Sequence, residues 1–183
     1  MDMQLVDKCQ QALTSVEATF TTLLQKHGKL HPTSIFAARQ HGLMLQWNKQ
    51  YTSALGVLKN VRSLQVQVHG EEHPDTLVTA WRIGSLLILP DTGITDLAAA
   101  VKLLRWTASR QSHCLSPEHP NTLRTLVSLG EAIALQGLPA GQIEAKKLFE
   151  QCEKLQKQIL DAAHPELVKT QALLVQQSRC PRV

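Results

Sequence analysis

Apolar residues recur along the chain at the three- and four-residue intervals of amphipathic helices, and the same columns return in successive segments. One column holds Ile35, Leu77, Leu123 and Val168, and a second, in the intervening segments, holds Val16, Leu58, Leu104 and Phe149. This spacing places the apolar residues of each segment on one helical face. The pattern predicts eight helices, at roughly 2–27, 32–47, 50–69, 74–89, 95–114, 120–137, 141–160 and 165–178.

The dipeptide His-Pro marks a repeat unit. It occurs four times, at spacings of 42, 46 and 45 residues, beginning at His31, His73, His119 and His164. Pro is favoured at the first position of a helix, so each His is expected at or just before the N-cap. We call the helices that follow His-Pro first-type helices and the intervening ones second-type helices.

Two further positions keep a fixed distance from each His. An Ala lies nineteen residues before it in all four copies, at Ala12, Ala54, Ala100 and Ala145. A Gly lies eleven residues after it in three copies, at Gly42, Gly84 and Gly130, whereas the fourth copy has Val175. Gly in the middle of a helix disfavours the helix, so its recurrence predicts that a neighbouring helix passes too closely for a Cβ. Gly28 and Gly70 suit the C-terminal turns of second-type helices.

No single helix pair can bury these columns, so the pairs must stack. The sequence therefore predicts an all-α, right-handed superhelical αα-solenoid as one domain over 1–183. It would comprise a half repeat 1–30, repeats 31–72, 73–118 and 119–163, and a half repeat 164–183. Both terminal helices would lack their usual partner. They would cap the stack, continue a longer array or self-associate with another chain.

Composition narrows the class of protein. Hydrophobic residues make up 43% of the chain and aromatic residues 4%, which favours helix over sheet and a packed core. The net charge of +4 comes without a Lys/Arg-rich run, so nucleic-acid binding is not expected. The N-terminal residues lack the pattern of a signal peptide and no apolar run is long enough to span a membrane, so we expect no signal peptide, no membrane insertion and a cytoplasmic protein.

The sequence offers no chemistry typical of an enzyme or a metal site. It lacks a phosphate-binding loop, a nucleophile elbow and an HExxH motif, so no catalytic residues and no cofactors are predicted. Equivalent histidines in stacked helices would lie roughly 10 Å or more apart, too far to share a metal. The four cysteines (Cys9, Cys114, Cys152 and Cys180) show no CxxC spacing, and His41 is expected to be partly buried and hydrogen-bonded.

The segments GEEHPDTL and SPEHPNTL, with the Gly and Ala at their fixed offsets, resemble tetratricopeptide (TPR) repeats of the kinesin light chain type. That resemblance implies a protein–protein interaction scaffold whose first-type helices line a concave groove. The pattern resembles the helical tail of SET/MYND methyltransferases more distantly. This chain departs from the family where paired Asn residues often precede the Gly by three and two positions, because Arg39-Gln40, Trp81-Arg82 and Val127-Ser128 stand there.

The resemblance implies a peptide-binding surface on the first-type helices. Its candidate residues are Phe36, Arg39, Gln40, Leu43, Val78, Trp81, Arg82, Ser85, Arg124, Ser128 and Lys169. Its four cations would face a single acid, Glu131, so we expect an extended or helical ligand that mixes acidic and aromatic residues. In the alternative, Phe36 and Trp81 merely pack between helices, and the chain is a regulatory or oligomerisation segment of a larger signalling protein or a helical appendage of an enzyme.

Overall fold

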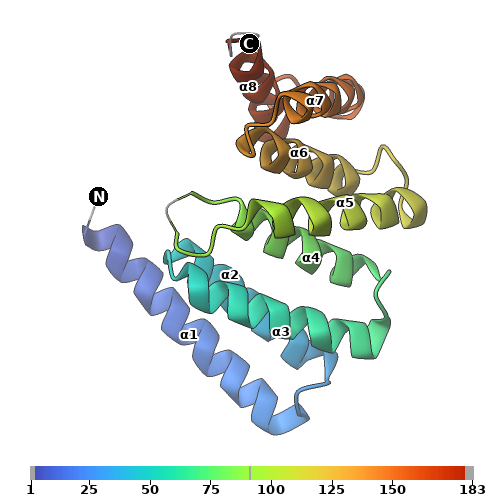
Figure 1. Cartoon of the computed structure of the whole chain (residues 1–183). Helices are drawn as coiled ribbons and strands as arrows, with labels where there is room; N and C mark the ends of the chain where they lie inside the picture. Colours follow the sequence, from blue (N-terminus) through green and yellow to red (C-terminus); the bar gives the residue numbers. More distant parts are fainter. Residues whose placement is uncertain (1–2, 91, 180–183) are drawn as a thin grey trace. The chain divides into compact units, whose positions relative to one another are not determined.

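A computed structural model describes residues 3–90 and 92–179, and within these ranges the chain forms helices and no strands (Figure 1). The predicted helices are confirmed to within about two residues at most ends. Their bounds are α1 Met3–His27, α2 Pro32–Trp47, α3 Tyr51–His69, α4 Pro74–Leu87, α5 Leu97–Cys114, α6 Pro120–Leu135, α7 Pro139–Ile159 and α8 Pro165–Arg179.

The helices fall into two compact units. Unit 1 spans Met1–Ile94 and unit 2 spans Thr95–Val183. In unit 1, α1 packs on α2, α2 on α3 and α3 on α4, so each helix contacts its neighbour in the chain. In unit 2, α5 packs on α6, α6 on α7 and α7 on α8, and α6 also touches α8. The expectation of one domain over the whole chain stays a prediction.

Each His-Pro begins a first-type helix, as the sequence predicts. The imidazole Nδ1 of the His accepts a hydrogen bond from the backbone N–H two residues later, which is otherwise unpaired at a helix start. The distances are 3.3 Å at His31, 3.2 Å at His73, 3.1 Å at His119 and 3.2 Å at His164. The four histidines therefore act as N-caps.

The ends of the second-type helices also follow the sequence. Gly28 and Gly70 lie just after α1 and α3 with φ of +79° and +89°, a conformation in which a Cβ would be strained. Ser116 occupies the same place in the repeat after α5 and takes φ 144° despite its side chain. α7 begins earlier than predicted because Pro139 supplies its first helical residue.

The glycine column marks close helix–helix contacts. A Cβ built on Gly130 would lie 2.5 Å from Cε1 of Phe149 on α7, and one on Gly42 would lie 3.0 Å from Cδ2 of Leu58 on α3. Phe149 and Leu58 are fully buried and belong to one predicted column. The expected close contact is thus confirmed at Gly130. Gly84 is buried in α4, and its own close contact stays a prediction.

The last helix departs from the expected core. Val168 was predicted in the buried column with Ile35, Leu77 and Leu123, but it is 49% exposed, whereas those three are buried. Val175, at the glycine position, is 51% exposed. In the described part of the chain no second-type helix covers this face of α8, so the prediction for Val168 is wrong. Leu167, one residue earlier, is buried instead.

Gly130→Ala and Gly56→Ala should change stability in opposite directions. Both glycines lie inside helices, where Ala is favoured by about 1 kcal/mol. A Cβ added at Gly56 would meet no atom within 4 Å, so this replacement should stabilise the protein by about 0.5–1 kcal/mol. At Gly130 the buried Phe149 ring must shift, which costs about 1–3 kcal/mol and outweighs the helix gain. Urea unfolding measures both; equal effects would contradict the close contact.

Candidate functional site on the first-type helices

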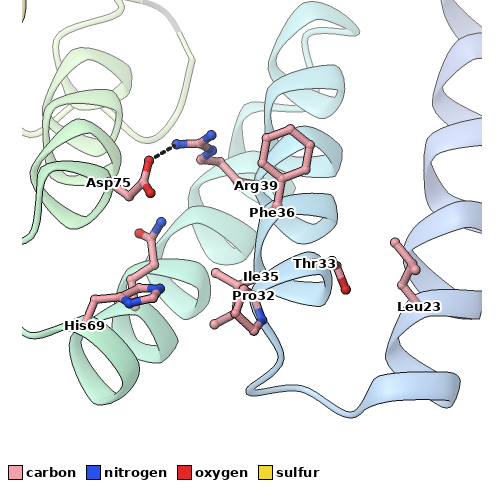
Figure 2. A pocket seen from close by; sticks show the side chains of 9 residues that line it. Leu23, Pro32, Thr33, Ile35, Phe36, Arg39, His69 and Asp75 are labelled. Carbon is pink, nitrogen blue, oxygen red and sulfur yellow. Dashed lines mark hydrogen bonds and ion pairs between the residues drawn. The ribbon is translucent and has the colours of Figure 1, made fainter.

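A pocket of about 550 Å³ opens in unit 1, where side chains of four helices converge (Figure 2). α2 supplies most of its wall from its first two turns, and α1, α3 and α4 each add one or two side chains. We call it the unit 1 pocket. It is lined by Leu23, Pro32, Thr33, Ile35, Phe36, Arg39, Gln65, His69 and Asp75.

Two of the predicted surface residues, Phe36 and Arg39, lie together in this pocket. They stand three residues apart on α2 and so share one face. The Phe36 side chain is 55% exposed, and the Arg39 guanidinium carbon lies 5.4 Å from the centre of its ring. Arg39 also forms an ion pair of 3.1 Å with Asp75 on α4, drawn as the dashed line in Figure 2. The interpretation that Phe36 packs between helices does not hold, since an aromatic ring this exposed is not core.

The other candidates of unit 1 lie outside the pocket and are half-buried. On α4 the Arg82 guanidinium carbon lies 4.8 Å from the centre of the Trp81 ring, within the range of a cation–π interaction. The side chains that are also half-buried are those of Gln40, Leu43, Val78 and Ser85. The structure therefore brings Phe36 and Arg39 to one pocket, and the other candidates of α2 and α4 do not line it.

In unit 2 the candidate cations are joined to acids. Arg124 on α6 pairs with Glu166 on α8 at 2.5 Å, and Lys169 on α8 pairs with Glu131 on α6 at 2.8 Å. These two bridges tie α6 to α8. Ser128 is only 4% exposed, so it is not part of an accessible surface.

The expectation that the cations face a single acid is therefore wrong. Asp75 and Glu166 occupy the first turns of α4 and α8, where a carboxylate also favours the helix dipole. The sequence pattern singled out neither acid. It did not reveal that Arg39 and Arg124 on the preceding first-type helices reach them.

Sequence reasoning missed Gln65, the most unusual residue of the pocket. It lies on α3 and is only 3% exposed, and its side-chain Oε1 has no hydrogen-bond partner. Leaving a buried amide atom unpaired costs about 1–3 kcal/mol. A signal was present in the sequence, because a Gln stands eleven residues after the fixed-offset Ala in three repeats, at Gln65, Gln111 and Gln156.

His69 lies in the wall of the pocket and contacts His73, the N-cap residue of α4. Their rings stack with centroids 4.5 Å apart, joining the last turn of α3 to the N-cap of α4.

His41 lies outside the pocket and is partly buried. Its Nδ1 has no hydrogen-bond partner, and its ring stacks on that of Phe20 with centroids 5.9 Å apart. The partial burial expected for His41 is confirmed, and Nδ1 does not form the expected hydrogen bond.

Metal-binding and membrane-spanning features are absent from the same described ranges. They contain no group of three His, Cys, Asp or Glu side chains placed to hold a metal ion. None of their helices is both long enough and apolar enough to span a bilayer. Cys152 is fully buried and Cys114 exposed, while the side chain of Cys9 and all of Cys180 lie outside the described residues.

Comparisons with known proteins agree with this geometry. This chain superposes on two crystal structures of nearly identical TPR-like repeats from a Podosopora anserina kinesin light chain, with TM-scores of 0.76 and 0.74. Their sequence identities are 23% and 24%, and each match covers 95% of this chain and 79% of the other. The chain has the TPR-like repeat fold. No protein-family model matches it, and no curated protein matches it.

Repeat folds of this kind form extended surfaces from stacked helix pairs. Function within a repeat fold depends on the particular side chains that its surface displays. The absence of enzymatic activity, of a cofactor and of nucleic-acid binding stays a prediction, as does a cytoplasmic location.

The Cys152 thiol provides a pH test of the buried core. Burial raises the pKa of Cys152 from 9.0 to about 12. The unfolded chain ionises this thiol near pH 9, whereas the folded chain keeps it neutral until about pH 12, so its contribution lowers stability as pH rises between these values. Cys152→Val removes the titration. Urea unfolding measures the free energy of unfolding of the variant minus that of the natural chain, and this difference should increase with pH across that interval. A difference that stayed constant with pH would contradict the burial of the thiol.

Proposed function

We propose that the chain is a protein-interaction scaffold that binds a peptide segment of a partner protein at the unit 1 pocket. The observation that carries the proposal is the convergence of an exposed aromatic ring, Phe36, and a guanidinium, Arg39, at the mouth of one pocket. Aromatic and Arg side chains dominate the binding energy of protein interfaces. Gln40, Leu43, Val78, Trp81, Arg82 and Ser85 extend this surface along α2 and α4.

The charges of the pocket favour a ligand with an acidic residue beside an apolar one. Arg39 contacts Asp75 through a single nitrogen, Nη1, so the guanidinium retains further N–H donors for a carboxylate. The Asp75 side chain is about half exposed and competes for the same guanidinium. A peptide carboxylate would therefore replace part of an existing ion pair. Because of this competition, removal of the Asp75 carboxylate should strengthen peptide binding, whereas removal of the Arg39 guanidinium should weaken it.

Phe36→Ala should weaken binding of an acidic, aromatic-containing peptide by about 2 kcal/mol, the size of an interface hot spot, with little change in the free energy of unfolding. The probe is a fluorescein-labelled peptide selected from a display library that places one aromatic residue among acids, and fluorescence anisotropy gives the affinity. Asp75→Asn should strengthen binding a few-fold, because it removes the competing carboxylate, and Arg39→Gln should weaken binding. Both variants should stay folded, because a surface ion pair contributes only about 0–1 kcal/mol to stability.

Leu135→Ala is the matched control. Leu135 is also 55% exposed but lies on α6 in unit 2, away from the pocket. Its replacement should leave the affinity unchanged. The proposal would be contradicted if Phe36→Ala and Leu135→Ala weakened binding equally, or if no peptide of this class bound the natural chain.

A second candidate function is self-association through α1 and α8, which a specific observation favours. In α3 and α7 the Ala and the apolar residue four positions later are fully buried, whereas Ala12 and Val16 of α1 are only partly buried. On α8 the matching first-type face leaves Val168 and Val175 about half exposed. Among the described helices, α1 thus has a partly uncovered second-type face and α8 a partly uncovered first-type face.

These two faces are complementary in size. Within the units a first-type Gly meets a large second-type side chain, Leu58 at Gly42 and Phe149 at Gly130. At the open faces Val175 replaces the Gly, and the smaller Val16 stands in the column of Leu58 and Phe149. If α8 of one copy packed against α1 of another in the register of the repeat, Val175 would contact Val16. The extra volume of Val175 relative to Gly would then be offset by the smaller volume of Val16 relative to Leu or Phe.

A head-to-tail contact of this kind makes a distinctive mixing prediction. Val16→Glu blocks the α1 face and Val175→Glu blocks the α8 face, so each variant alone should be monomeric by light scattering while the natural chain self-associates with concentration. An equimolar mixture of the two variants should form a one-to-one dimer, because one intact face of each kind remains. A monomeric natural chain would contradict this second function and leave the pocket proposal standing.

A further inference from the structure

The ionisable side chains in the wall of the unit 1 pocket are those of Arg39, His69 and Asp75. Arg39 and Asp75 form an ion pair of 3.1 Å, so their charges offset each other. His69 is exposed, and in Figure 2 its ring lies on the same side of the pocket as Asp75. The net charge of the pocket wall therefore depends on whether His69 carries a proton.

A second histidine connects His69 to the ion pair. The ring of His73 stacks on that of His69 with centroids 4.5 Å apart. Its Nδ1 accepts a hydrogen bond of 3.2 Å from the backbone N–H of Asp75 and lies 4.0 Å from the carboxylate oxygen Oδ2 of the same residue. Arg39 contacts the other oxygen, Oδ1. A proton on Nδ1 would turn this acceptor into a donor beside the carboxylate, so protonated His73 would compete with Arg39 for Asp75.

A stacked histidine pair elsewhere in the repeat does not have these contacts. His27 and His31 stack in the same way at the start of α2, with centroids 4.7 Å apart, but Thr33 stands there in the place of Asp75. Neither His27 nor His31 lines the pocket. In unit 2 the residues four positions before the capping histidines are Leu115 and Leu160. The His69–His73 pair thus differs from these in touching both the pocket wall and an acid.

We propose that the His69–His73 pair makes peptide binding at the unit 1 pocket sensitive to pH, with acidic peptides bound more tightly once the pair carries a proton. Histidine is the side chain whose charge ordinarily changes between about pH 5 and 8. Across that range a guanidinium stays charged, and the carboxylates of a peptide, which ordinarily titrate near pH 4, stay ionised. This inference rests on the proposed peptide-binding function and adds to it a means of regulation.

The two histidines act in the same direction. A proton on His69 gives the pocket wall a net positive charge, which attracts the carboxylate of the ligand. A proton on His73 draws the carboxylate of Asp75 toward Nδ1, which leaves more of the Arg39 N–H donors to the peptide. Both changes favour an acidic ligand.

The other charged groups near the pair do not reverse this sign. Glu71 and Glu72 lie in the turn between α3 and α4, but both are exposed and neither lines the pocket, so water and salt screen their charges. The side chain that α1 contributes to the wall, Leu23, carries no charge. From α2 and α4 the charged groups are Arg39 and Asp75, which form the ion pair itself.

Affinity measured against pH tests the proposal. The probe is the acidic, aromatic-containing peptide selected for the pocket, in an unlabelled form without histidine and with its N-terminus acetylated. Isothermal titration calorimetry should show that the natural chain binds it about fivefold more tightly at about pH 5.5 than at about pH 7.5, which corresponds to about 1 kcal/mol, the size of one exposed charge pair. Buffers of different ionisation enthalpy should show that binding near pH 6.5 takes up protons.

Two double variants separate this pair from the other stacked pair of unit 1. His69→Gln with His73→Asn removes both titrating rings, and Asn is a favoured N-cap for α4. This variant should change affinity by less than about twofold across the same interval. His27→Gln with His31→Asn is the matched control and should keep the full response. His69→Gln alone leaves the cap of α4 in place and should give a smaller response than the natural chain, so the test does not depend on the stability of the double variant.

Three outcomes would overturn the inference. The affinity of the natural chain could stay constant or fall as the pH is lowered, or the response could be equal in the natural chain and in both histidine double variants. In these cases the probe still binds, so loss of binding in Phe36→Ala would leave the proposed function intact. Failure of the probe to bind at any pH would overturn the proposed function and the inference together.

Discussion

The structure depends on how closely a second-type helix can pass over the middle of a first-type helix. At Gly130 the Phe149 ring occupies the space where a Cβ would be, and at Gly42 the side chain of Leu58 lies against the missing group. This approach fixes which turn of each helix faces its neighbour. It thereby sets the columns that are buried, and it leaves the residues on the adjoining face of α2, such as Phe36, at the surface. The His-Pro caps hold the start of each first-type helix in the same register, so the pocket is built from the first two turns of α2.

The features that the sequence predicts are those that depend on local geometry repeated several times. The N-cap role of His119, the left-handed turn at Gly70 and the buried column through Leu123 each follow from one residue and its fixed offset. Val168 breaks the rule because burial is a property of the neighbouring helix and not of the valine itself. An apolar residue at the right interval is buried only where another element covers it, and the described chain has none over that face of α8.

The site was predicted only in part, for a similar reason. Phe36 and Arg39 could be singled out because the pattern predicts their helix and the TPR resemblance implies that first-type helices line the groove. The partners that change their chemistry come from other helices, as Asp75 from α4 and Gln65 from α3 show. The ion pair of Arg39 lowers the positive charge that the sequence alone suggested. Gln65 recurs at a fixed offset in the sequence, but its burial and its place in the pocket wall depend on the helices around it.

The side-chain amide of Gln65 gives the most direct view of the central claim, which is that the unit 1 pocket receives a peptide. Its Nε2 protons can be followed by nuclear magnetic resonance in the intact chain during titration with the selected peptide. Binding at the pocket predicts that these protons shift together with the backbone amides of α2 near Phe36, and that their exchange with water slows. Saturable binding that shifts residues of α8 and leaves the Gln65 protons unchanged would contradict the claim.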